Sequence, residues 1–169
     1  MSITTAAKHG ALNWLWLAAG VVALDQLSKW AVVRSFALYE VVTLLPVLDF
    51  TRLHNTGAAF SLLAGASGWQ RWFFVALAGG VSIAITLWLR RIDPVRQRLL
   101  PAGLALVMGG ALGNVIDRLW HGHVIDFIHV HWQQNYFPAF NVADIAITIG
   151  AGLLILDSLL DSRRHGARA

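Results

Sequence analysis

The chain has 169 residues, of which 57% are hydrophobic and 13% are charged. Soluble domains have roughly 45–50% apolar and about 25% charged residues, so this composition excludes disorder and argues against a soluble globule. The net charge is +4, but the basic residues are too few and too close to the ends for a nucleic-acid binder. The length predicts one domain, residues 1–169. The absence of cysteine excludes disulfides, thiol nucleophiles and cysteine-ligated zinc.

Four stretches are apolar enough to cross the hydrocarbon core of a membrane, which takes about 20 helical residues. The predicted spans are residues 11–33, 72–89, 99–116 and 142–160. The first is apolar as far as Leu24 and then contains Asp25 and Lys29. These two residues are spaced i,i+4, so they share one face of the predicted helix.

Residues 1–24 also allow a second interpretation. Lys8 precedes an apolar run whose length is typical of a cleaved secretory signal peptide. No small-x-small cleavage site closes that run. We therefore expect an uncleaved first span.

The basic residues predict the direction of the chain, because short loops rich in Lys and Arg stay in the cytoplasm. One side of the membrane receives eight of them, namely Lys8, Arg90, Arg91, Arg96, Arg98, Arg163, Arg164 and Arg168. The other side receives five, namely Lys29, Arg34, Arg52, Arg71 and Arg118. Both termini are therefore predicted to be cytoplasmic, with segments 34–71 and 117–141 facing outward.

The first outward segment contains residue types that favour strands. Its β-branched and aromatic residues are Val41, Val42, Thr43, Val47, Phe50 and Thr51. Pro46 interrupts them, so we expect short strands or a hairpin on the membrane surface, followed by a turn at residues 55–61. The expected fold is an all-α membrane protein with four transmembrane helices and a small β-containing subdomain on the outer side.

Two aspartates stand out, because a charge at the centre of a membrane span costs at least about 2.5–3.5 kcal/mol. Asp144 lies in the first turn of the fourth span, behind Asn141, and is either an acid stabilised by the helix dipole or a functional group. Asp126 is flanked by apolar residues and is either a loop aspartate bonded to backbone amides or a half-buried functional acid. If both share one site of low dielectric, one carboxyl group keeps a proton while the other accepts one, as general acid/base hydrolysis requires.

The outer end of the third span carries further polar residues. Asn114 and Arg118 are spaced i,i+4 and share a face. Arg118 either balances nearby carboxylates or extends toward lipid headgroups, and Asp117 is its nearest local partner. The spacing of Gly109 and Gly113 permits close helix contact. The small residues of the fourth span that could meet them are Ala143, Ala146, Gly150 and Ala151.

Four histidines surround Asp126 in two His-x-His pairs, namely His121, His123, His129 and His131. Imidazole and carboxylate groups bind zinc or non-haem iron, so a metal-dependent membrane hydrolase is one alternative function. The pairs lack the helical i,i+4 spacing of zincin motifs, and we favour interfacial histidines with no metal and no other cofactor. A non-enzymatic four-span scaffold or small transporter, with polar residues lining a path, is the other alternative.

Five motifs follow one another along the chain: Asp25-Gln26-x-Ser28-Lys29, Asn55 to Ser61, Gly109-Gly110-Ala111-x-Gly113-Asn114-x-x-Asp117-Arg118, Gly122-x-Val124-x-Asp126-Phe127 and Phe140-Asn141-x-Ala143-Asp144. Together they resemble the bacterial lipoprotein signal peptidase family, also called signal peptidase II. The resemblance covers nearly the whole chain, and no position of the pattern is missing. The histidines are not part of it.

The resemblance implies an aspartic endopeptidase of the bacterial inner membrane, with its active site and β-containing subdomain on the periplasmic side. It implies an enzyme that cuts diacylglyceryl-modified prolipoproteins just before the lipidated cysteine. We expect a monomer that meets membrane lipids and no nucleic acid. The implied catalytic pair is Asp126 and Asp144. The implied substrate-binding residues are Asn55, Gly57, Asn114, Arg118, Val124 and Asn141. Asp25 and Lys29 are implied to be either supporting residues or a structural ion pair.

Overall fold

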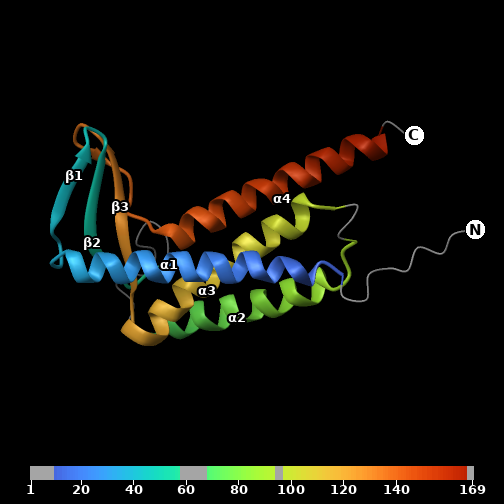
Figure 1. The fold of residues 1–169 in the computed structure, drawn as a ribbon, viewed down its shortest axis with the longest axis horizontal. Helices are drawn as coiled ribbons and strands as arrows, with labels where there is room; N and C mark the ends of the chain where they lie inside the picture. Colours follow the sequence, from blue (N-terminus) through green and yellow to red (C-terminus); the bar gives the residue numbers. More distant parts are fainter. Residues whose placement is uncertain (1–9, 58–67, 94–96, 167–169) are drawn as a thin grey trace, which may run out of the picture.

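The computed structural model describes residues 10–57, 68–93 and 97–166 of the chain. The helices are α1 (Leu15–Ser35), α2 (Trp69–Leu89), α3 (Leu99–His121) and α4 (Val142–Gly166), with a short 3-10 helix, η1 (Leu12–Trp14), before α1. The strands are β1 (Val41–Leu45), β2 (Leu48–Asn55), β3 (Val124–Trp132) and β4 (Asn135–Tyr136). The strands β1 to β3 lie at one end of the helices, and the start of α1 and the end of α4 lie at the other (Figure 1). Of the predicted turn 55–61, residues 58–61 lie outside the described residues.

The four predicted spans overlap the four long helices. By length and composition, the segments Trp69–Leu89, Leu99–His121 and Val142–Ser162 can each cross a membrane. Helix α1 is as long as α2, with 21 residues, but it contains Asp25 and Lys29, both buried. Helix α3 continues to His121, beyond the predicted end of its span, because the charged residues of its last turns have partners inside the protein.

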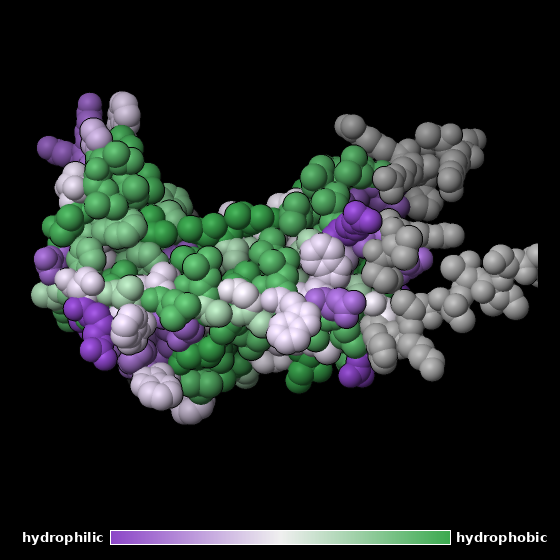
Figure 2. Space-filling model, viewed as in Figure 1, coloured by the Kyte–Doolittle hydropathy of each residue, from purple (hydrophilic) through white to green (hydrophobic). Residues whose placement is uncertain are grey.

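The outer surface of the helices is apolar. The exposed fractions of Leu24 in α1, Ile83 in α2 and Ile155 in α4 are 61%, 65% and 62%. Figure 2 shows a mostly hydrophobic middle, with hydrophilic residues toward both ends. Soluble monomers rarely expose apolar areas of this extent, whereas lipid tails accept them at no cost. The helices therefore have the exterior of a bundle embedded in a membrane.

The strands form one antiparallel sheet in the order β1-β2-β3-β4. The predicted hairpin is confirmed as β1 and β2, which pair Val41 with Thr51 and turn at residues 46–47. Strand β3 was not predicted. Its first four residues are all buried, so they lack the alternation of a half-exposed strand. Pairing with β2 places Asp126 opposite Leu53 and Val124 opposite Asn55.

Helix α3 is the central helix, since it packs against α1, α2 and α4. Its glycines allow the close approach of α1. A Cβ atom on Gly109 would lie 2.8 Å from the carbonyl oxygen of Ala18, and one on Gly113 would lie 2.6 Å from Oδ2 of Asp25. The predicted contact of Gly109 with α4 is therefore wrong, because this glycine faces α1.

Other glycines bring α3 against α4. A Cβ atom on Gly103 would lie 2.9 Å from the carbonyl oxygen of Gly150, and one on Gly110 would meet the carbonyl oxygen of Ala143. Ala146 is buried, whereas Ala151 is exposed. Three of the four small residues predicted in α4 are thus in the interior. The expected contact of Gly113 is present, since a Cβ atom there would lie 3.4 Å from Cβ of Ala143, whereas Gly103 and Gly110 supply the other contacts.

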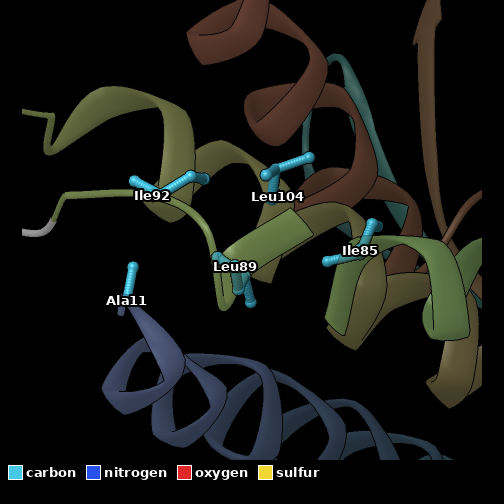
Figure 3. Packing of buried hydrophobic residues seen from close by; sticks show 5 residues of the cluster. All are labelled: Ala11, Ile85, Leu89, Ile92 and Leu104. Carbon is cyan, nitrogen blue, oxygen red and sulfur yellow. The ribbon is translucent and has the colours of Figure 1, made fainter. Parts of the chain in front are cut away.

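A small apolar cluster closes the end of the bundle that is opposite the sheet. Figure 3 shows its side chains, which come from the residue before η1, the end of α2, the link after it and α3: Ala11, Ile85, Leu89, Ile92 and Leu104. The backbone N–H of Ala11 donates to the carbonyl oxygen of Leu89 at 2.8 Å. This contact joins the start of the first helical segment to the end of α2.

We predict that Gly110→Ala weakens the packing of α3 on α4. The new Cβ atom would meet the Ala143 carbonyl oxygen and lie 2.7 Å from Cγ1 of Ile147. Overpacking of this kind costs about 1–3 kcal/mol, which denaturant unfolding in detergent micelles measures. Gly79→Ala is the control, since nothing lies within 4 Å of its Cβ position. Equal losses in the two variants would contradict the prediction.

Candidate active site

The predicted site residues gather where α3, α4, β2 and β3 meet. Their positions are Asn55 at the end of β2, Gly57 just after it, Asn114 and Arg118 in α3, Val124 and Asp126 at the start of β3, and Asn141 and Asp144 at the start of α4. Strand β3 follows α3 after a single intervening loop, and its pairing with β2 brings Asn55 to the same place. The sheet therefore brings segments that are distant in sequence to one end of α3.

Asn141 connects the two aspartates. Its side-chain Nδ2 donates to Oδ1 of Asp126 at 2.7 Å. Its Oδ1 accepts from the backbone N–H of Asp144 at 3.0 Å, and its own backbone N–H donates to Oδ2 of Asp144 at 3.3 Å. This reciprocal pair is a helix N-cap, as predicted for Asn141. The asparagine has no exposed surface, so it serves both carboxyl groups from within the protein.

Asp126 is a buried acid with a perturbed pKa. Only 3% of it is exposed, and its Oδ2 accepts from Nδ2 of Asn55 at 3.0 Å. Burial raises the pKa of Asp126 to about 6, and the negative charge of Asp144 adds to that rise. The hydrogen bonds from Asn55 and Asn141 act in the opposite direction, because they favour the ionised form. A carboxyl group with this pKa changes its protonation state near pH 6.

Both aspartates open into one cavity of about 690 Å³. Its polar lining consists of Asn55, Asn114, Arg118, Asp126, Asp144 and Thr148. Most of the remaining wall is apolar and includes Phe74, Leu77, Val81, Val124, Ile145 and Phe137. Asp144 is held toward α3, since its Oδ1 accepts from Nδ2 of Asn114 at 2.9 Å. The cavity thus combines two carboxyl groups with a surface suited to an apolar chain.

Arg118 is buried and lies in the wall of the cavity. Its Nη2 donates to the carbonyl oxygen of Gly57 at 2.8 Å, its Nη1 donates to the carbonyl oxygen of Asn114 at 3.3 Å, and its guanidinium lies 4.8 Å from the ring centre of Phe74. Gly57 and Asn141 are not in the cavity wall, unlike the other predicted substrate-binding residues. The expectation that Asp117 pairs with Arg118 is wrong, because the Asp117 carboxylate contacts a different cation.

That cation is Lys29, at the centre of a buried ionic cluster. Its Nζ lies 2.8 Å from Oδ2 of Asp25, 2.9 Å from Oδ2 of Asp117 and 3.0 Å from Oδ1 of Asn114. Nε2 of Gln26 donates to Oδ1 of Asp117 at 2.9 Å. We call these five residues the Lys29 cluster. The predicted pairing of Asp25 with Lys29 is present, whereas Asp117 and Gln26 were not predicted as site residues.

A sequence signal for Asp117 did exist. Asn114 and Asp117 are spaced i,i+3 and so share one face of α3. Asp25 and Lys29 share a face of α1 in the same way. Two polar faces within apolar helices are expected to meet, because each would otherwise contact lipid.

The histidines lie apart from the two aspartates. His123 stacks on His54 with ring centres 3.7 Å apart, and Nε2 of His131 lies 3.3 Å from Oδ2 of Asp49. The other ring contacts are those of His121 with His123, and of His129 and His131 with Tyr136. Burial, with smaller contributions from His54 and His121, lowers the pKa of His123 to about 4. Within the described ranges, no three His, Cys, Asp or Glu side chains are grouped to hold a metal ion.

Known proteins are similar to this chain along most of its length. Residues 17–160 match the family model described as Signal peptidase (SPase) II. A lipoprotein signal peptidase of Shewanella piezotolerans is 52% identical over 159 residues, which are 94% of this chain and 93% of the relative. One of Acinetobacter baumannii is 51% identical over 147 residues, which are 87% and 83% of the two chains. A solved structure described as a bacterial membrane enzyme has a TM-score of 0.78 at 29% identity and covers 92% of each chain.

The raised pKa of Asp126 predicts a dependence of stability on pH. Between pH 3.8 and about pH 6, the folded protein holds a proton at Asp126 that the unfolded chain has lost. The free energy of unfolding therefore falls as the pH rises through this window. In the Asp126→Asn variant, the side chain at residue 126 does not titrate in this pH window. Its stability relative to the unmodified protein should therefore rise by about 3 kcal/mol across the window. Denaturant unfolding on both sides of the window measures this difference, and parallel pH curves would contradict it.

Proposed function

The chain belongs to the signal peptidase II family, and we propose that Asp126 and Asp144 are the catalytic pair with which it cleaves the signal peptides of prolipoproteins. The family consists of aspartic peptidases, and the chain is a multi-pass membrane protein. One observation carries the assignment. The carboxyl groups of Asp126 and Asp144 line one cavity and are linked through Asn141.

The proposed reaction is hydrolysis with no covalent intermediate. One carboxylate takes a proton from a water molecule, whose oxygen attacks the scissile carbonyl carbon. The other carboxyl group donates a hydrogen bond to the carbonyl oxygen, and a proton passes to the leaving amine when the C–N bond breaks. The pKa of about 6 at Asp126 supports a pair that shares one proton.

The polar residues around the pair receive separate roles. Asn55 and Asn114 each donate to one carboxyl group, and we assign them to orient those groups and to contact substrate. Asn141 orients both aspartates from its buried position. Arg118 is assigned to a substrate carbonyl, which is supported by its place in the cavity wall and by a buried Nε that has no partner among the described residues. Val124 and Gly57 complete the proposed substrate-binding set, Val124 in the wall and Gly57 through Arg118.

The proposed substrate is a prolipoprotein with a diacylglyceryl group on its cysteine, cut just before that cysteine. The apolar wall, which comes largely from α2, α3 and α4, suits an apolar signal helix that enters sideways from the lipid. The acyl chains then remain in the bilayer. We propose a monomer without a cofactor, because all the groups assigned to catalysis come from one chain.

The proposed orientation has both termini in the cytoplasm and the active site near the periplasmic face of the inner membrane. The sheet lies at one end of the bundle, and the start of α1 and the end of α4 lie at the other (Figure 1), which supports this arrangement. Arg90, Arg91 and Arg98 lie at the ends of α2 and α3 that are remote from the sheet. Residues 8, 96 and 168, which also entered the charge count, lie outside the described residues.

We predict that Asp126→Asn and Asp144→Asn each lower the cleavage rate by about 10²–10⁴-fold, because each removes one half of the acid/base pair. The assay is release of the signal peptide from a purified lipidated prolipoprotein in detergent or lipid. Asp49→Asn is the control, since Asp49 is also a buried carboxylate but contacts His131 in the sheet. An Asp144→Asn enzyme that cleaves at the normal rate would refute the pair.

The same assay separates the alternatives. Cleavage that persists in the presence of a strong chelator is expected, and its loss would favour the metal-dependent hydrolase. A scaffold or transporter would release no signal peptide.

The orientation predicts a labelling pattern for single cysteines, which the native sequence lacks. Gln134→Cys, in the turn between β3 and β4, should react with a membrane-impermeant maleimide in cells whose outer membrane alone is permeable. Ser162→Cys, exposed near the end of α4, should react only after the inner membrane is opened. The reverse pattern would invert the proposed topology.

A further inference from the structure

Each proposed catalytic aspartate directly follows a residue whose backbone N–H is held by a buried carboxylate. The N–H of Ala143, before Asp144, donates to Oδ1 of Asp25 at 2.9 Å. The N–H of Ile125, before Asp126, donates to Oδ2 of Asp117 at 3.1 Å. The two halves of the site are therefore attached to the Lys29 cluster by equivalent contacts.

The two carboxylates are themselves fixed. Asp25 and Asp117 have 0% and 1% of their surface exposed, and Nζ of Lys29 lies within 2.9 Å of both. Asp25 comes from α1 and Asp117 from α3. A shift of one carboxylate relative to the other would break an ion pair in a medium that cannot replace it with water. The distance between the two attachment points is thus set by one ammonium group.

We propose that Asp25 and Asp117 are positioning residues, which fix the backbone at Ala143 and Ile125 and thereby set the separation and orientation of the two catalytic carboxyl groups. This inference rests on the proposed function of Asp126 and Asp144. Asp25 acts on the Asp144 half of the site, and Asp117 acts on the Asp126 half. Neither residue is in the wall of the cavity, so their action is through the backbone.

The local structure explains why a carboxylate is used. Ala143 lies in the first turn of α4, where backbone N–H groups have no carbonyl partner within the helix. A buried N–H without an acceptor is costly, and an ionised acceptor gives a shorter and stronger hydrogen bond than a neutral one. Asp25 supplies that acceptor from a neighbouring helix. The start of α4 is consequently tied to α1 next to the residue that must be placed accurately.

The inference predicts a crossed pattern of amide exchange. Asp117→Ala should raise the hydrogen-exchange rate of the Ile125 N–H by about tenfold or more and leave that of Ala143 nearly unchanged. Asp25→Ala should do the reverse. NMR of protein labelled at Ile and Ala measures both sites in folded molecules. Each variant keeps one carboxylate for Lys29, so no unpaired buried cation is created.

The kinetic test compares alanine with asparagine at the same positions. Asp117→Ala and Asp25→Ala should lower kcat by about 10- to 100-fold, as small misplacements of catalytic groups do, while KM changes by less than about threefold. Asp117→Asn and Asp25→Asn keep an oxygen acceptor and should recover most of kcat. Asp49→Ala, which removes a buried carboxylate in contact with His131, controls for a general loss of folding.

The outcomes separate this inference from the proposed function. Equal loosening of both amides in either alanine variant, or a freed amide with unchanged kcat, would overturn the positioning roles. If Asn variants at residues 126 and 144 are inactive but the crossed exchange pattern is absent, the positioning roles fail alone. If those two variants are active, the proposed function fails, whatever the amide pattern. A crossed pattern together with asparagine rescue supports both.

Discussion

The ammonium group of Lys29, shared by carboxylates from two helices, is the contact on which the site depends. An ion buried this deeply is tolerated only when its partners and remaining hydrogen bonds are all in place, and leaving one charge unpaired costs about 3–5 kcal/mol. Here the condition is met, since Asp25 and Asp117 use their oxygens on Lys29, Gln26 and two backbone amides. Such a network is satisfied at only one relative position of α1, α3 and α4. It therefore specifies the placement of the helices more than it adds to their stability.

Close packing around α3 makes that network possible. Apolar side chains gain little by leaving lipid for a helix interface, so membrane helices associate through small residues and polar contacts. Gly113 shows how the two are combined, because a Cβ atom at this position would lie 2.6 Å from the Asp25 carboxylate. Any side chain there would displace Asp25 from Lys29. The glycine motif of α3 thus serves the polar cluster as well as helix contact.

The sequence was sufficient for features that depend on local pattern. Apolar length predicted helices at all four spans, and β-branched residues around Pro46 predicted the hairpin. It was insufficient where a distant segment decides the outcome. Strand β3 forms because β2 pairs with it, and Asp117 turns from its neighbour Arg118 to Lys29 because α1 lies there. The motifs named the aspartates, but only the fold places Asn141 between them.

The balance of charge explains why the site has two classes of aspartate. Asp25 and Asp117 share Lys29 directly, so each of them contacts a cation. Among the described contacts, Asp126 and Asp144 receive neutral amide donors and no cation at hydrogen-bond distance. Burial raises the pKa of Asp126, and the negative charge of Asp144 adds to that rise. The described ion pairs thus give Lys29 to Asp25 and Asp117, whereas the proposed catalytic pair at the cavity has only amide donors at hydrogen-bond distance, which favours the retention of one proton.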